Sequence, residues 1–205
     1  MDDDVRTALI RQWDLIAEAV PRIDLAVASR VAGWRNREVL AHLYAQPSLL
    51  LRFLESESDA RPAVRAAENL AGTRAFGELI DDSAREGASR DKFELRIPVE
   101  RARTAVLTAH LGAVIETLQG SITVGDYLVT RCVEAVVHGG DLVEPVVPDP
   151  VAQAIAAGAL FELLAVVAPD LAGEARALPV GAWIDVATGR TPVSGPLAAA
   201  TPLMT

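Results

Sequence analysis

Residues 123–142 of the chain, TVGDYLVTRCVEAVVHGGDL, carry the clearest helix signal in the sequence. Thr123 stands three positions before Asp126, as in a capping box with Asp in place of Glu, and such a box marks the first turn of a helix. The pattern predicts a helix that runs to about Leu142. Within it, Glu134 and His138 are four positions apart, so both side chains leave the same face about one turn apart.

A carboxylate and an imidazole at this spacing can reach one metal ion together. The same pair is also common as a solvated pair on a helix surface, and the spacing alone leaves both readings open. Arg131 and Asp141 bracket Glu134 and His138. Arg131 could hold Glu134 or the carboxylate of a ligand, and Asp141 could orient an imidazole. Ordinary salt bridges are the alternative for both.

His42 lies in an apolar stretch, Val39-Leu40-Ala41-His42-Leu43, on a second predicted helix. An unpaired imidazole is costly to bury there, so we expect it to contact a carboxylate, a backbone carbonyl or a metal ion. Asn36 is the expected N-cap of this helix. Pro47 should kink or interrupt it.

The other segments read mostly as helix. A first helix should extend over residues 5–20, a third from Pro98 to about Leu118, and a fifth over residues 151–168. His110, on the helix predicted from Pro98 to about Leu118, is interpreted as mainly structural. Phe93–Ile97 alternates like a short strand. After Pro169 the composition turns to Pro, Gly and Ala. Ala182–Val186 could form one short strand or turn of helix, and the rest is predicted to be an irregular tail on the surface.

The composition disfavours several classes of function and location. The net charge of −9 opposes binding to a nucleic-acid backbone. Cys132 is the only cysteine, which excludes an internal disulfide, and with the acidic N-terminus it favours a cytoplasmic protein. We interpret Cys132 as a small core residue. The apolar stretch Val151–Pro169 contains Glu162 and is interpreted as a buried helix, not as a membrane span.

Two signatures resemble the mycothiol-dependent maleylpyruvate isomerase family, relatives of the DinB-like metal-binding bundles. One is Gly33-Trp34 followed by Val39–Leu43; the other is Arg131, Glu134 and the run Val137–Leu142. The resemblance covers roughly residues 5–165. It implies an all-α, DinB-like four-helix bundle over residues 1–168, with an additional C-terminal helix and a short irregular extension, 169–205, packed on the bundle.

The resemblance also implies a divalent metal ion, with zinc expected, held by His42, Glu134 and His138. Mycothiol would be the thiol co-substrate of a transferase or isomerase that acts on an electrophilic small molecule, with Arg131 as a candidate catalytic residue. Full-length isomerases of this type carry a further α/β domain, of which Trp183–Arg190 is a candidate remnant, so isomerisation of maleylpyruvate itself is not implied.

Two other readings of the site stay open. The chain could be a metal- or small-ligand-binding protein without turnover, such as a sensor or accessory protein. It could also be a bundle without metal, whose histidines are satisfied by carbonyls and carboxylates. Bundles of this class often pair through exposed helix faces, so a homodimer is an expected assembly.

Overall fold

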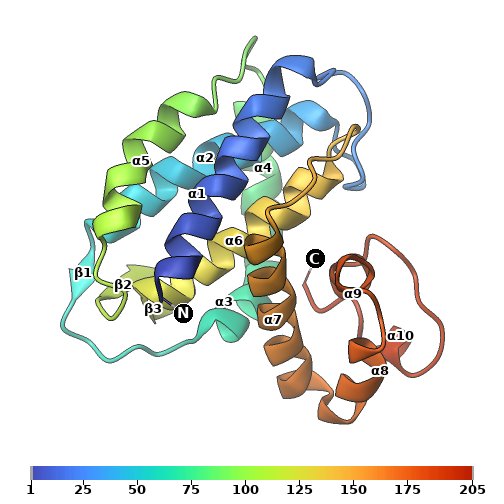
Figure 1. Ribbon diagram of the computed structural model, residues 1–205. Helices are drawn as coiled ribbons and strands as arrows, with labels where there is room; N and C mark the ends of the chain where they lie inside the picture. The colour runs from blue at the N-terminus through green and yellow to red at the C-terminus, as the bar shows by residue number, and fades with distance from the viewer. Residues whose placement is uncertain (1, 205) are drawn as a thin grey trace.

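The computed structural model describes residues 2–204, without the side chains of residues 2–4 and 57. Helices dominate, and one small antiparallel sheet lies at the end of the bundle, so the expected all-α class is confirmed (Figure 1). The helices are α1 (Asp2–Ala19), α2 (Asn36–Leu54), α3 (Ala66–Gly72), α4 (Gly77–Gly87), α5 (Arg96–Thr108), α6 (Val124–Asp141), α7 (Pro150–Val167), α8 (Ala172–Arg176), α9 (Val180–Ala187) and α10 (Leu197–Ala200). The strands are β1 (Glu57–Ser58), β2 (Val114–Thr117) and β3 (Gly120–Thr123).

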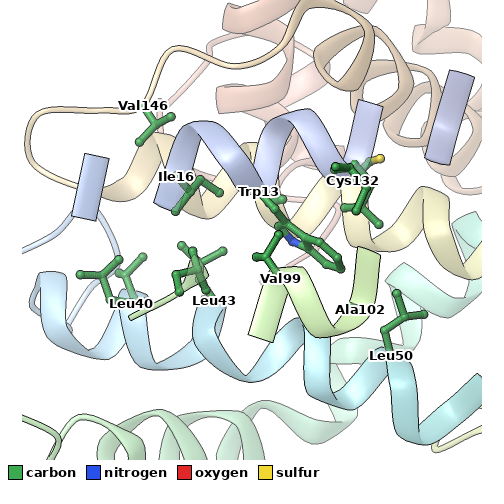
Figure 2. Close-up of a cluster of buried hydrophobic side chains, with 14 of the residues drawn as sticks. Trp13, Ile16, Leu40, Leu43, Leu50, Val99, Ala102, Cys132 and Val146 are labelled. Carbon is green, nitrogen blue, oxygen red and sulfur yellow. The ribbon is translucent and has the colours of Figure 1, made fainter. Parts of the chain in front are cut away.

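Helices α1, α2, α5 and α6 form the four-helix bundle, and α4 packs along α2. Figure 2 shows the bundle core, in which Trp13 and Ile16 from α1 meet Leu43 from α2 and Val99 from α5. A second core cluster lies on the opposite side of α6, between α6, α7 and α9. Helix α6 is therefore covered by apolar side chains on two sides, which explains why so few of its residues reach solvent.

The predicted beginnings of α6 and α7 are confirmed. The Thr123 hydroxyl accepts a hydrogen bond from the Asp126 backbone N–H at 3.1 Å, as an N-cap should. Asp149 caps α7 by accepting from the backbone N–H groups of Val151 and Ala152, both at 3.0 Å. Pro150 occupies the first turn of α7, where its missing N–H costs nothing.

The expected N-cap of α2 is wrong. Arg35, not Asn36, is the N-cap residue. The buried Asn36 amide instead donates to the Asp24 carbonyl at 2.8 Å and accepts from the Val143 backbone N–H at 3.0 Å. Of the two effects expected at Pro47, an interruption does not occur, because the helix is continuous through it, and a kink there stays a prediction. Packing of α2 against α4, α5 and α6 holds the helix together despite the lost hydrogen bond.

The third helix is shorter than expected, because α5 ends at Thr108 and a hairpin of β2 and β3 follows. The run Val114–Thr117 is rich in β-branched residues, which favour strands. Gly120 begins the return strand with φ of +118°, a conformation that L side chains rarely adopt. His110 lies exposed in the loop before β2 and not on a helix.

The expected strand Phe93–Ile97 is also absent. Phe93 and Leu95 are buried in the loop that leads into α5, and α5 begins at Arg96. The apolar residues alternate because Phe93 and Leu95 point into the core. Within the described part of the chain, the segment does not pair with a neighbouring strand.

The segment after Pro169 is not an irregular tail, because it folds into α8, α9 and α10. Trp183 on α9 is fully buried and stacks on Phe161 of α7, with ring centroids 4.7 Å apart. Within residues 2–204, α7 is the one helix long and apolar enough to cross a membrane by length and composition; it packs against α6 and α9. The boundary between residues 168 and 169 stays a prediction, since the second core cluster draws residues from both sides of it.

Candidate metal centre

Helices α2 and α6 bring the three predicted ligands together. His42 Nε2 lies 2.9 Å from Glu134 Oε2, and His138 Nε2 lies 3.4 Å from the same oxygen. One ligand atom from each residue lies within 4.8 Å of the other two. Donor atoms bound to one tetrahedral zinc ion at about 2.0–2.1 Å would be separated by roughly 3.3 Å. The separations from Glu134 Oε2 are close to that value.

His42 Nε2 has two polar neighbours, Glu134 and Gln46. The Gln46 amide nitrogen, a donor, lies 3.0 Å from His42 Nε2. Arg131 donates to the amide oxygen of Gln46, and this bond fixes which way round the amide lies. Nε2 carries either one proton or one lone pair, so it can donate to Glu134, accept from Gln46 or bind a metal ion, but only one of these at a time. The contact with Glu134 at 2.9 Å fits the form that is protonated at Nε2, and loss of that proton would free the nitrogen for a metal ion.

His138 is oriented from behind by a carboxylate. Its Nδ1 lies 2.8 Å from Asp141 Oδ2, one turn further along α6, as the sequence suggested. A carboxylate at Nδ1 keeps the proton on that nitrogen and leaves Nε2 for a metal ion. Arg190 then grips Asp141 by both oxygens, with Nε 3.0 Å from Oδ1 and Nη2 2.7 Å from Oδ2.

The Trp34 ring lies beside the imidazole rings of His42 and His138. It is nearly parallel to that of His138, with centroids 6.3 Å apart, and tilted against that of His42 at 5.9 Å. The indole N–H donates to Asp81 on α4 at 2.6 Å. The residue preceding it, Gly33, has φ of +79°, which lets the chain turn sharply before α2.

Charge is divided unevenly between the two imidazoles of the site. Burial lowers the pKa of His42, and its hydrogen bond with Glu134 only partly offsets this. Burial also works against charge on His138, but the hydrogen bonds with Asp141 and Glu134 outweigh it and raise its pKa to about 9. Burial would raise the pKa of Glu134, yet the two imidazoles hold it well below its usual value. At neutral pH the site thus holds a carboxylate and one imidazolium.

A pocket of about 420 Å³ reaches all three donors. Its walls come from the loop before α2, from the start of α4 and from two stretches of the C-terminal segment, 188–190 together with Pro202 and Met204. The side chains of His42, Glu134 and His138 are 11%, 8% and 14% exposed, so they are buried yet reachable from the pocket. This volume lies within the usual range for small-molecule sites.

The family model described as the mycothiol maleylpyruvate isomerase N-terminal domain matches residues 6–143, more than half of the chain. The chain belongs to this family. Neither the curated proteins nor the solved structures contained a match. The matched region spans α1 to α6 and includes the three donor residues and Asp141, whereas Arg190 lies beyond it.

Arg131, within the family's second signature, is placed differently from the other signature residues. Its guanidinium hydrogen-bonds Gln46, as noted, and stacks over the Tyr127 ring at 4.7 Å, while the pocket is lined by other residues. Arg131 therefore acts on His42 through Gln46 in this arrangement. Its role as a catalytic residue stays a prediction.

Sequence reasoning missed Gln46 and Arg190. Gln46 is four positions after His42 on the same helix, a spacing that could have revealed it. Arg190 follows a segment expected to be irregular, and no local pattern indicates its contact with Asp141. Cys132 is buried in the bundle core, where burial raises the pKa of its thiol, as expected of a packing residue.

Proposed function

We propose that this family member is a metal-dependent enzyme of the cytoplasm that uses a thiol, with zinc as the ion and mycothiol as the co-substrate. It would act on an electrophilic small molecule as a transferase or isomerase. The observation that supports this most strongly is the meeting of His42, Glu134 and His138 at the wall of a pocket of ligand size. The link to mycothiol comes from the description of the family.

Two imidazole nitrogens and one carboxylate oxygen leave at least one coordination position free, as in catalytic zinc sites. His42 and His138 would hold the ion through Nε2, and Glu134 through Oε2. When bound, the ion would supply Lewis acidity, which lowers the pKa of a thiol ligand and favours the thiolate nucleophile.

The remaining residues prepare the site for this chemistry. Glu134 supplies a buried negative charge that offsets the charge of the ion. Asp141 keeps the His138 proton on Nδ1. Trp34 and the apolar wall residues Ile80 and Met204 limit the access of water to the donors, which strengthens electrostatic interactions inside the pocket.

Elemental analysis by plasma mass spectrometry tests the metal centre first. Untagged protein purified without chelator should carry about one zinc ion per chain. His42→Ala should lose it, and His110→Ala, which changes the exposed histidine in the loop before β2, should keep it. Absence of metal from the unaltered protein, even after soaking with zinc, would remove the proposed function and leave histidines with a structural role.

Turnover is tested separately on the zinc-loaded protein. Electrophiles are offered with mycothiol, with another thiol or with none, and both thiol consumption and conversion of the electrophile are followed, with and without prior chelation, because an isomerase would regenerate its thiol. Conversion of the electrophile that needs both mycothiol and zinc supports the enzyme. Zinc binding without turnover of any pair would instead favour a sensor or accessory protein.

A further inference from the structure

Asp141 lies at the centre of a three-residue chain that crosses from the C-terminal segment to the candidate metal centre. Its side chain is fully buried, and its two oxygens have Arg190 on one side and His138 on the other. Arg190 approaches with two parallel N–H groups, the geometry that fixes both the position and the plane of a carboxylate. Asp141 Oδ2 in turn contacts His138 Nδ1.

Arg190 is itself held firmly. It follows α9, and its backbone N–H donates to the Asp185 carbonyl at 2.7 Å. Its Nη1 donates to the carbonyl of Thr188 at 2.6 Å, and its side chain is only 14% exposed. The side chain is therefore ordered before any ligand arrives, so little rotamer entropy is lost in orienting Asp141.

We propose that Arg190 is a positioning residue of the metal centre, acting through Asp141 on His138, so that the segment following α9 is part of the site. This inference rests on the metal centre of the proposed function. Arg190 lies outside the family match at residues 6–143, so the inference concerns a contribution from this chain's own C-terminal segment. Thr188 and Gly189, just before it, line the same pocket.

The physical reason lies in the freedom of the Asp141 carboxylate. With only His138 as partner, the carboxylate could rotate about its terminal bond, and the imidazole ring could follow it. When Arg190 binds both of its oxygens, the Asp141 carboxylate has one fixed orientation. It then holds the His138 Nδ1–H in one direction, which would direct His138 Nε2 toward the ion. An arginine that only fastened the C-terminal segment to α6 would change the stability of the fold but not its affinity for zinc.

The test measures zinc affinity by competition with a chromophoric chelator, on full-length protein. Arg190→Lys keeps the positive charge but loses the two-pronged grip, and should weaken zinc binding about tenfold, as is common for outer partners of metal ligands. Arg103→Lys is the matched control, since Arg103 also holds both oxygens of one carboxylate, that of Glu100, through Nε and Nη2, and it pairs with Asp14 of α1 besides. It should leave the affinity unchanged.

Asp141→Asn is a second variant for the same measurement, in case Arg190→Lys folds poorly. Adding Arg190→Lys to Asp141→Asn should cause no further loss of affinity, because both changes break the same chain. Unchanged zinc affinity in a folded Arg190→Lys, or additive losses in the double variant, would overturn the inference while leaving the metal centre intact. Absence of zinc binding by the unaltered protein would overturn the centre and the inference together.

Discussion

His42 Nε2 lies 2.9 Å from Glu134 Oε2, although 92 positions separate the two residues in the chain. The contact joins α2 to α6, two of the helices that build the bundle core. An ion bound there would cross-link these helices, so ligand binding and folding should be thermodynamically linked.

Zinc should therefore stabilise the fold. At a free zinc concentration 100 times the dissociation constant, the free energy of unfolding should rise by about 2.7 kcal/mol. His110→Ala should show the same rise, and His42→Ala none. Urea unfolding with and without zinc measures this, and an equal rise in His42→Ala would place the binding elsewhere.

Zinc binding should release a proton at neutral pH. In the metal-free protein the pKa of His138 is raised from 6.5 to about 9, because the hydrogen bonds with Asp141 and Glu134 outweigh its burial. At pH 7.5 zinc must displace this proton, so about one is released per ion, and affinity should rise with pH until about 9. Calorimetry in buffers of different ionisation enthalpy counts the proton. The same count at pH 7.5 and pH 10 would contradict the assignment.

The proton on His138 should also stabilise the metal-free fold in a defined window. Its folded pKa lies above the unfolded value, so the contribution is complete below about pH 6.5 and is lost as the pH rises through 9. Urea unfolding of chelator-treated protein across this range should show falling stability, and His138→Gln should flatten that fall.

Trp34 should report on the metal. It is the tryptophan whose ring faces both candidate imidazoles, whereas Trp13 and Trp183 are buried in the two core clusters. Cobalt ions quench indole fluorescence at short range, so a cobalt titration should lower the Trp34 fluorescence until the site is saturated. Trp34→Phe should abolish most of this change, and quenching that survives it would mean that cobalt binds near another tryptophan.

Trp183 should be a major stabilising residue, although no sequence pattern indicated a role for it in the core. Trp183→Ala removes a fully buried ring stacked on Phe161 and should cost about 3–5 kcal/mol. Leu79→Ala, at a position 56% exposed on α4, should stay within about 0.5 kcal/mol of the unaltered protein. Urea unfolding compares them. Equal stabilities would mean that the second cluster contributes little.

The meeting of the three candidate ligands was predictable, because their signals are local or were supported by the family resemblance. Glu134 and His138 share a helix face by spacing alone. His42 has no such neighbour in the sequence, and its apolar surroundings indicated only that it needs a partner. Which partner it meets depends on the packing of α2 against α6, and the family signatures supplied that link.

The missed features depend on tertiary contacts. Pro47 breaks local helix rules, but packing against three neighbouring helices keeps α2 continuous. The hairpin after α5 was signalled by Val114–Thr117 and Gly120, and the periodicity of the preceding helix concealed it. The C-terminal segment is rich in Ala, Gly and Pro, and its fold depends on burying Trp183 against α7, which no short window of sequence reveals.

The candidate metal ligands and much of the pocket wall lie on different kinds of structural element. The donors stand on α2 and α6, and α6 is locked between two cores, so their positions can hardly change without unfolding the protein. Much of the wall comes instead from loops, at residues 30–32 and 188–190 and at Pro202 and Met204. Apart from Arg190, which holds Asp141, substitutions in these loops can reshape the cavity at small cost to the scaffold. Relatives with one inherited metal chemistry could therefore diverge in what they accept, and this chain's preference should be sought in its loops.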